Sequence, residues 1–288
     1  MAQIKVSELF YSIQGEGRYI GVPSIFLRTF GCNFTCGGFG LPSGHLSDER
    51  TKIDAEAIQN YKDLPLVHTG CDSYASWDPR FKHLSPVLSV DTLTESINNI
   101  LPFKTWREEH LVITGGEPLL GWQRAYPELL SHEKMRNLKE LTFETNGTQE
   151  LSTELRHYLL DWTLNPKEVA GVRRGRDALT FSVSPKLTNS GEKREEAICP
   201  DIITQYEYVG HTYLKFVVSI HDHVDEALEV TNMYRKAGFK GSVYLMPVGG
   251  VENVYGLNKR RVADLAMKYG LRYSDRLQVP LFKNEWGT

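Results

Sequence analysis

Three of the four cysteines in this chain have the spacing of ligands to a metal centre. Cys32 and Cys36 lie in GCNFTC, directly after the apolar run SIFLRTF, and a short loop of this kind can point two thiolates at one centre. They could be half of a zinc site, although zinc usually takes two further Cys or His ligands at close spacing. Three thiolates suit a cluster of four irons better, because the fourth iron then stays open for an exogenous ligand.

The third cysteine stands far from the first two. A C-x-x-x-C-x-x-C run would end at Phe39, which cannot ligate iron. The segment GCDSYASW, which contains Cys71, resembles the end of the cluster motif in one branch of the radical S-adenosylmethionine superfamily, C-x-x-x-C-x-x-C-D-[T/S]-x-x-x-W. The resemblance makes Cys71 the third ligand. The alternative is that Cys71 is incidental and the cluster is lost. The fourth cysteine, Cys199, is expected to be a small buried residue.

A longer segment narrows the resemblance. FYSIQGEGRYIGVPSIFLRTFGCNFTC is similar to the 7-carboxy-7-deazaguanine synthase family through the pattern Q-G-E-G-x-x-x-G-x-P-x-x-F-x-R-x-x-G-C. The similarity resumes at Cys71, continues through Thr114–Pro118, Glu144–Thr148 and Ser184–Lys186, and thins after about residue 190. The resemblance implies a radical lyase that converts 6-carboxy-5,6,7,8-tetrahydropterin to 7-carboxy-7-deazaguanine with loss of ammonia, in queuosine-type 7-deazapurine biosynthesis.

The resemblance also implies the cofactors: a [4Fe-4S] cluster, S-adenosyl-L-methionine and Mg²⁺. Glycines in TGGEP let a ligand approach the backbone closely, and a carboxylate there can accept from an ammonium group. A carboxylate at the end of the next strand could bind a ribose hydroxyl, and magnesium prefers hard oxygen ligands. The implied cofactor residues are Gly116, Glu117, Glu144, Ser184, Pro185 and Lys186, with Ser73 as the magnesium ligand.

A planar heterocycle with a carboxylate needs acceptors for its ring N–H groups and a forked donor for its carboxylate. Family substrate positions fall on Ile13, Gln14, Gly15, Arg28 and Thr114, and chemistry adds Glu16. Arg28 could be an ordinary surface arginine. It sits in the middle of an apolar run, however, where a charge needs a partner, and this favours a functional role.

Apolar runs alternate with helical patterns, which predicts an α/β fold with a parallel sheet. The resemblance implies a partial, modified (β/α) barrel of the radical S-adenosylmethionine type. Helices are expected at Val90–Leu101, with Asp91 as its cap, and at Val224–Ala237 and Leu257–Tyr269. Strands are expected at Ser24–Phe30, His110–Thr114, Glu140–Glu144, Trp162–Leu164, Leu179–Val183, Tyr213–Ser219 and Ser242–Met246.

One segment breaks this pattern. Residues 37–70 are polar, rich in Gly, Pro, Asp and Lys, and long for a loop inside a compact domain. We expect one domain over residues 1–288 with an insertion at about 37–70, which is disordered or carries a short helix near Asp54–Lys62. Two domains remain an alternative.

Composition limits the class of protein. The 288 residues carry a net charge of −3 and are 41% hydrophobic, so no general basic field indicates nucleic-acid binding. There is no apolar run of membrane-spanning length and no secretory signal, which predicts a cytoplasmic protein with reduced thiols. The resemblance suggests a homodimer and an electron donor such as flavodoxin or ferredoxin.

Two other functions stay open. The chain could be a related activating enzyme that acts on a partner protein, although the QGEG segment and Arg28 indicate a small-molecule pocket. It could also be a degenerate, non-catalytic homologue. Two departures from the family pattern concern the pocket: Met246-Pro247 replaces a Q-P segment, and Gln278 stands where a histidine is common.

Overall fold

The computed structural model describes residues 1–164 and 174–288 of the chain, and their backbone is organised around one sheet. The strand order is β3-β1-β2-β4-β5-β6-β7-β8-β9. The strands are β1 (Gln3–Ile13), β2 (Pro23–Thr29), β3 (Val87–Ser89), β4 (His110–Gly115), β5 (Leu141–Thr145), β6 (Leu179–Val183), β7 (His211–Val218), β8 (Val243–Pro247) and β9 (Arg272–Tyr273).

The sheet is mostly parallel. β2 and every strand that follows it in the sheet pair in parallel, whereas β1 pairs antiparallel with both β2 and β3. The sheet does not close, because β3 and β9 remain its edges. The expectation of an α/β fold built on an open, partial barrel is therefore confirmed.

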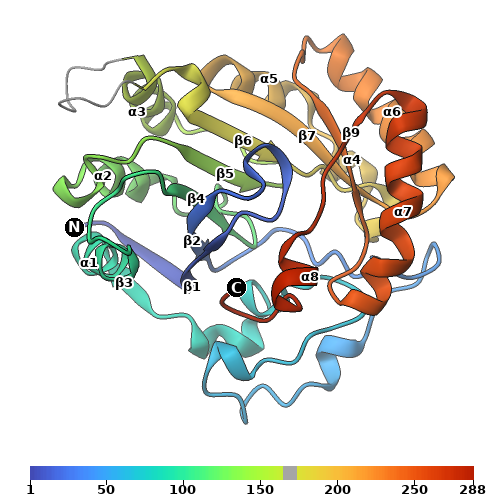
Figure 1. Ribbon diagram of the computed structural model, residues 1–288, viewed down its shortest axis with the longest axis horizontal. Helices are drawn as coiled ribbons and strands as arrows, with labels where there is room; N and C mark the ends of the chain where they lie inside the picture. The colour runs from blue at the N-terminus through green and yellow to red at the C-terminus, as the bar shows by residue number, and fades with distance from the viewer. Residues whose placement is uncertain (165–173) are drawn as a thin grey trace.

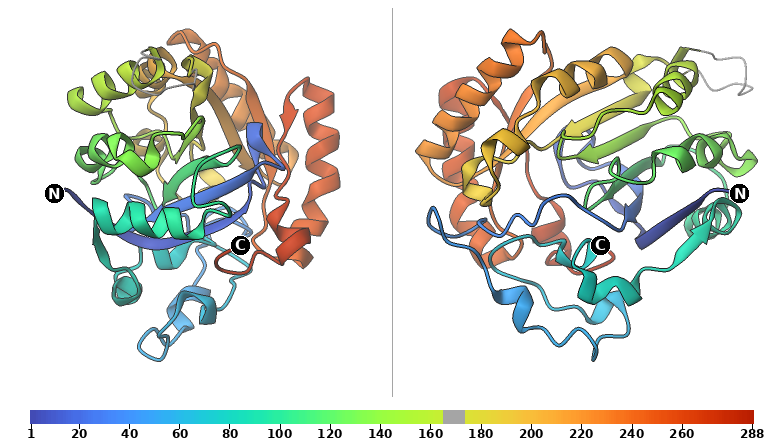
Figure 2. Two further views of the ribbon diagram at one scale, coloured as in Figure 1. Left: turned by 60° about the vertical axis from the view of Figure 1, so that its left-hand side comes forward. Right: turned by 180° about the vertical axis from the view of Figure 1, so that it is seen from behind.

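Helices connect the parallel strands and lie along the outer side of the curved sheet (Figures 1 and 2). This arrangement leaves the carboxyl ends of the strands free to form a site. The α-helices are α1 (Val90–Ile100), α2 (Tyr126–Ser131), α3 (Thr153–Leu164), α4 (Arg194–Ala197), α5 (Pro200–Val209), α6 (His221–Lys236), α7 (Glu252–Tyr269) and α8 (Gln278–Phe282).

Most expected elements are present, with small shifts at their ends, but the strand expected at Trp162–Leu164 is wrong. These residues form the last turn of α3. Leu155, Leu159 and Trp162 are the buried apolar residues of that helix, and their spacing of four and three is helical. The short apolar run was therefore one face of a helix.

The helix expected at Val90–Leu101 is present as α1, but its cap is not Asp91. The Ser89 side chain accepts from the backbone N–H of Thr92, so Ser89 is the N-cap. Asp91 lies in the first turn, where its negative charge is favourable beside the helix N-terminus. Cys199 is half-buried rather than buried, at the start of α5.

The N-terminal strand β1 was not expected, and its irregular register explains why. Val6 pairs with Thr29 and Glu8 pairs with Arg28, so Ser7 is an extra residue that forms a β-bulge. A bulge interrupts the alternation of buried and exposed residues by which a strand is recognised in a sequence. The same bulge turns Glu8 toward Arg28 on the neighbouring strand.

The insertion at 37–70 is folded against the rest of the protein. It contains short 3₁₀ helices at Glu49–Lys52 and Tyr61–Asp63, and the helix expected near Asp54–Lys62 is otherwise absent from these described residues. Its two ends are joined where the Gly70 N–H donates to the Phe39 carbonyl at 2.8 Å. In Figure 1 the insertion runs below the sheet, beside the C-terminus.

The insertion has a small hydrophobic core that is separate from the main one. Ala55, Leu64 and Val67 from the insertion pack with Tyr74 and Phe81, which follow it in the sequence. Partly buried apolar side chains complete this second core, namely Ile53, Ile58, Tyr61, Trp77, Leu84 and Trp286. Trp286, near the C-terminus, therefore packs against the insertion at 37–70.

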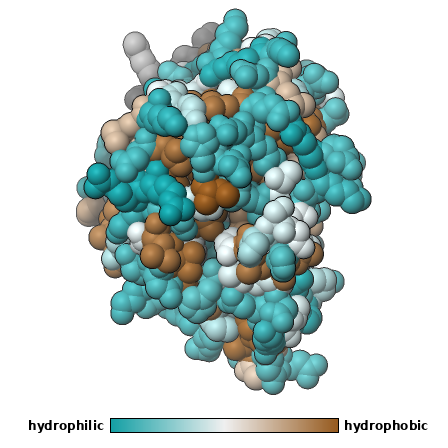
Figure 3. All heavy atoms as spheres, turned by 90° about the vertical axis from the view of Figure 1, so that its right-hand side faces the viewer, coloured by the Kyte–Doolittle hydropathy of each residue, from teal (hydrophilic) through white to brown (hydrophobic). Residues whose placement is uncertain are grey.

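The face formed by α6 and α7 is largely hydrophilic, with apolar side chains in separate small patches (Figure 3). None of the helices in the described parts of the chain combines the length and the apolar character needed to span a membrane.

We expect His110 to make stability depend on pH. Its imidazole is fully buried in β4, with Nε2 at 2.8 Å from the Thr142 hydroxyl. Burial, with a smaller effect of the Arg18 charge, lowers the pKa of His110 to about 3. The unfolded chain, with a histidine pKa of about 6.5, takes up a proton between about pH 6.5 and about 3 that the folded protein does not.

The free energy of unfolding should therefore decrease as the pH is lowered through this window. His110 contributes at most about 1.4 kcal/mol per pH unit to this decrease. His110→Gln should make the dependence shallower. Urea unfolding at about pH 6.5 and about pH 5 measures it, and His45→Gln, at an exposed histidine, is the matched control. Parallel profiles for wild type and His110→Gln would contradict the expectation.

Candidate active site

A cavity of about 270 Å³ lies at the carboxyl ends of the parallel strands. The alternation of side chains along each strand produces its lining. On β2, Ile25 and Leu27 belong to the core while Phe26 and Arg28 line the cavity. β5, β6 and β7 behave in the same way, so that polar side chains collect on one side of the sheet. They include Thr114, Glu144, Ser182, Ser184 and Lys215.

All three cysteines expected to bind a cluster line this one cavity, although the insertion separates Cys71 from the others in the sequence. Burial raises the pKa of the Cys32 thiol to about 12 and raises that of Cys36 and Cys71 as well. The thiols lie close enough for their charges to act on one another and for the Lys186 ammonium to oppose this shift. Three thiolates beside one another in a buried site need a cation, which a metal centre supplies.

The loop that carries Cys32 packs tightly against the end of β4. A Cβ atom on Gly116 would lie 2.4 Å from the Gly31 carbonyl oxygen and 2.7 Å from Cys32 Cβ. The Glu117 N–H donates to the same Gly31 carbonyl at 2.7 Å. Glycine at position 116 is therefore required for this close approach of two backbones.

Glu117 lies below the cavity rather than in it. Its side chain is 0% exposed. Its carboxylate accepts from the Asn146 N–H at 2.6 Å, the Thr145 hydroxyl at 2.8 Å and the Leu119 N–H at 3.0 Å. It holds the ends of β4 and β5 together.

Arg28 is not a surface arginine. Its Nε lies 2.7 Å from Glu8 Oε2, and its Nη1 lies 3.2 Å from the Ser73 hydroxyl. Burial lowers the pKa of Arg28, but the charges of Glu8, Asp72 and Glu144 outweigh this and raise it overall. The guanidinium is thus held in the cavity by a partner on the adjacent strand, opposite the β-bulge.

A second group of charges surrounds Glu16. Its carboxylate pairs with Lys215, with Arg276 Nε at 3.2 Å, and accepts from Gln278 Nε2 at 2.9 Å. Burial opposes ionisation of Glu16, but Lys215 and Arg276 lower its pKa to about 2. Arg276 also contacts Asp72 Oδ2 at 2.5 Å. With both oxygens engaged, Glu16 organises the pocket and has little capacity left for a ligand.

Glu144 joins these groups to the strand ends. It accepts from Gln14 Nε2 at 3.1 Å through one oxygen and from the Thr114 hydroxyl at 3.2 Å through the other. Residues expected at separate sites, one for the cofactor and two for the substrate, are therefore adjacent in a single cavity.

The C-terminus forms one wall of the cavity. Residues 284–288 line it. The Trp286 ring packs 5.6 Å from the Tyr61 ring and 5.5 Å from the Tyr74 ring, measured between centroids. Trp286 therefore attaches the end of the chain to the core of the insertion.

Nearly all the residues expected from the sequence lie together. Those that line the cavity are Ile13, Gln14, Gly15, Glu16, Arg28, Cys32, Cys36, Cys71, Ser73, Thr114, Gly116, Glu144, Ser184 and Lys186. Glu117 and Pro185 do not line it.

Sequence reasoning missed Glu8, Lys215, Arg276 and Trp286, which also line the cavity. A signal existed for Lys215, because it interrupts the apolar run YLKFVVS as Arg28 interrupts SIFLRTF. Nothing comparable marks Arg276 or Trp286, whose roles depend on contacts with distant segments.

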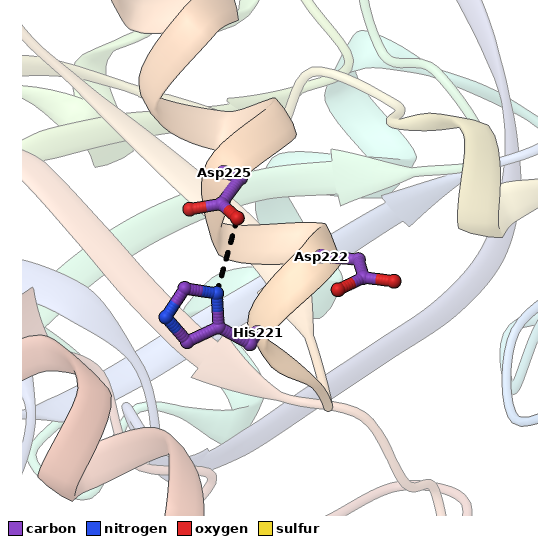
Figure 4. Close-up of side chains that lie close together, drawn as sticks. All are labelled: His221, Asp222 and Asp225. Atoms are coloured by element: carbon purple, nitrogen blue, oxygen red, sulfur yellow. Dashed lines mark hydrogen bonds and ion pairs between the residues drawn. The ribbon is translucent and has the colours of Figure 1, made fainter.

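A further group of potential ligands lies outside the cavity. His221, Asp222 and Asp225 have ligand atoms within 4.8 Å of one another at the start of α6 (Figure 4), and all three are exposed. His221 Nδ1 lies 3.0 Å from Asp225 Oδ2, and its Nε2 lies 2.7 Å from the Tyr269 hydroxyl. Both ring nitrogens of His221 have protein partners. We therefore interpret the group as hydrogen-bonded surface side chains.

Comparison with known proteins finds relatives that match along nearly the whole chain. No protein-family model matches the chain. The 7-carboxy-7-deazaguanine synthase of Halobacterium salinarum is 28% identical over 291 residues, covering 98% of this chain and 91% of the relative. The synthase of Pyrobaculum aerophilum is 27% identical over 285 residues, covering 99% and 97% of the two chains. The chain is a homologue of the 7-carboxy-7-deazaguanine synthases.

The likeness to these synthases extends to the fold. The crystal structure of QueE from Escherichia coli matches with a TM-score of 0.54 at 20% identity, covering 94% of this chain and 93% of the other. The synthase relatives match over nearly their whole length, so the similarity is not confined to one motif.

We expect Arg276 to be essential to the charge group. It is buried between Asp72 and Glu16, so Arg276→Met should lower the free energy of unfolding by up to about 3 kcal/mol, because it leaves the Asp72 carboxylate without this cation and leaves Glu16 paired with Lys215 alone. Urea unfolding near neutral pH measures the loss.

The double variant Asp72→Asn/Arg276→Met should be more stable than Arg276→Met alone, since it removes one of those carboxylates while keeping its shape. Simple addition of the losses in the two single variants would show that the pair is not coupled and would contradict this account.

Proposed function

We propose that the protein converts 6-carboxy-5,6,7,8-tetrahydropterin to 7-carboxy-7-deazaguanine and ammonia in queuosine-type deazapurine biosynthesis. The observation that supports this best is that Cys71, across the insertion, lies in the same cavity as Cys32, Cys36 and the polar strand ends. The sequences of the two synthases are similar to this chain over nearly its full length. The reaction adds no atom and loses only ammonia, so it needs no net oxidant.

The residues present fit a [4Fe-4S] cluster. Three buried thiols face one cavity, Lys186 offers a positive charge beside them, and position 116 carries no side chain against the cysteine loop. A cluster held by Cys32, Cys36 and Cys71 would, together with S-adenosylmethionine, supply the radical chemistry of the reaction. Three protein ligands would leave one of four irons free, as this chemistry requires.

We propose that the strand ends hold S-adenosylmethionine. Gly116 presents bare backbone beside Cys32, where the amino and carboxylate groups of the methionine portion would lie. Glu144, Ser184 and Lys186 line the next part of the cavity and offer an acceptor, a hydroxyl and an ammonium group. Glu117 contributes by holding β4 and β5 in place. Pro185 shapes the backbone between two lining residues.

The pterin would occupy the part of the cavity lined by Phe10, Phe26 and Arg28. The Phe10 and Phe26 rings stack 4.9 Å apart and form an apolar surface for a flat heterocycle. Arg28, held by Glu8, would bind the substrate carboxylate. Ile13, Gln14, Gly15 and Thr114 border the same space, and Glu16 keeps Lys215 beside it.

A magnesium ion would fit near Ser73. The Ser73 hydroxyl and the Asp72 carboxylate lie next to Arg28 in the cavity, so they can provide oxygen ligands close to the substrate carboxylate. Magnesium commonly takes few ligands from the protein and completes its shell with substrate and water. Binding there would neutralise charge on the substrate during rearrangement.

The other expected properties stay proposals. We infer that the protein works as a homodimer in a reducing cytoplasm and receives electrons from a flavodoxin or ferredoxin. A role as an activating enzyme for a protein partner is less well supported, because Trp286 and the residues around it close one side of the cavity.

Turnover tests the proposal directly. The purified protein, reconstituted anaerobically with iron and sulfide, should form 7-carboxy-7-deazaguanine from the pterin when supplied with S-adenosylmethionine and a reductant. Cys71→Ala should lose both the full cluster content and this activity, whereas Cys199→Ala, a half-buried cysteine that does not line the cavity, should keep both. A full cluster in Cys71→Ala would refute the assignment of the third ligand, and absence of product from wild type would refute the function.

The C-terminal wall should affect substrate binding more than chemistry. Trp286→Ala removes the contacts with Tyr61 and Tyr74 that hold residues 284–288 against the cavity. We expect KM for the pterin to rise about tenfold, which corresponds to about 1.4 kcal/mol, with a smaller change in kcat. Phe103→Ala, at an exposed ring, is the control. Unchanged KM in Trp286→Ala would show that the wall is not needed for binding.

A further inference from the structure

Glu192 makes an unusual set of contacts with the loop that carries the first two cysteines. A single carboxylate oxygen, Oε1, accepts from the Thr35 N–H at 2.8 Å, the Thr35 hydroxyl at 3.1 Å and the Cys36 N–H at 2.6 Å. No residue expected from the sequence to take part in the site makes this contact. Hydrogen bonds to an ionised acceptor are the strong ones, so this side chain is the main anchor of the loop.

The anchored backbone is strained. Cys36 has a φ of 48°, in the left-handed region that L-residues rarely adopt. Such a conformation persists where surrounding contacts impose it, and it is common at functional sites. The bond from the Cys36 N–H to Glu192 is the contact that acts on this backbone directly. It sets the direction in which the Cys36 thiol points into the cavity.

The segment that carries Glu192 is itself held in place. The Glu192 N–H donates to the Ser190 hydroxyl at 3.2 Å, and the Ser190 carbonyl accepts from the Gly38 N–H at 2.8 Å. A Cβ atom on Gly38 would lie 2.7 Å from the Gly191 nitrogen. The start of the insertion is therefore pressed against the loop after β6, which positions the carboxylate beside Cys36.

Charge gives Glu192 a second effect. Its Oε1 lies 2.6 Å from the Cys36 backbone nitrogen, which places a negative charge beside this cysteine. The carboxylate thus disfavours further negative charge at this sulfur. Reduction of a cluster adds an electron to it, and the potential of such clusters depends on nearby charge and on hydrogen bonds to their sulfurs.

We propose that Glu192 is a positioning residue that fixes Cys36 and lowers the reduction potential of the cluster bound there. It does so in two ways. Its charge opposes the added electron, and it occupies the Cys36 N–H, which then cannot donate to a cluster sulfur. This inference rests on the proposed function, since it concerns the cluster that Cys32, Cys36 and Cys71 would hold.

Glu192→Gln tests the charge, because an amide oxygen can still accept the three hydrogen bonds. The anaerobically reconstituted variant should contain as much iron and sulfide as wild type. Its midpoint potential, measured by a redox titration followed by electron paramagnetic resonance, should move to a more positive value. Glu192→Asp keeps the charge and should have a potential closer to that of wild type.

Glu226→Gln is the matched control. Glu226 also accepts from a backbone N–H and a hydroxyl, both of Thr188, which lies outside the loop that carries Cys32 and Cys36. Its variant should keep the wild-type potential. Glu192→Ala removes the anchor altogether and should lower the cluster content.

The outcomes separate this inference from the proposed function. If wild type assembles the cluster and Glu192→Gln has an unchanged potential, the inference is overturned while the proposed function stands. If Glu192→Gln does not fold, Glu192→Ala decides the question. Full cluster content in Glu192→Ala, together with the midpoint potential of wild type, overturns the inference equally. If wild type assembles no cluster, the proposed function is overturned and this inference with it.

Discussion

Buried ion pairs connect parts of this protein that lie far apart in the chain. Arg276, near the C-terminus, pairs with Glu16 after β1 and with Asp72 after the insertion, and Lys215 on β7 completes the group. These charges are buried, so each depends on the others for its stability. The pocket takes its shape from this dependence, since the four segments must all meet before every charge in the group is paired.

The cysteine site imposes a second constraint, which concerns the backbone. Two of the three thiols come from one loop and the third follows the insertion, so the ends of the insertion must return to the same place. Hydrogen bonds between Phe39 and Gly70 and between Gly38 and Ser190 achieve this. The main chain can therefore carry a long excursion inside a metal-binding motif without separating its ligands, because closing a longer loop costs little additional free energy.

Local patterns in the sequence were enough to predict much of the site. Arg28 interrupts an apolar run, Thr114 lies near a strand end and Cys32 follows a strand, whereas Cys71 was assigned from the GCDSYASW motif, and all four line the cavity. The rest depended on distant contacts. The Ser7 bulge that brings Glu8 to Arg28 breaks the very alternation used to recognise a strand, and the end of α3 was mistaken for a strand because three residues contain too little periodicity.

The position of Trp286 has a consequence for how the molecule is made and handled. Trp286 packs against the second core, so this core is not completed until the segment that carries Trp286 has left the ribosome. Any peptide fused after Thr288 would begin at the wall of the cavity. An affinity tag placed at the N-terminus leaves that wall as the sequence encodes it.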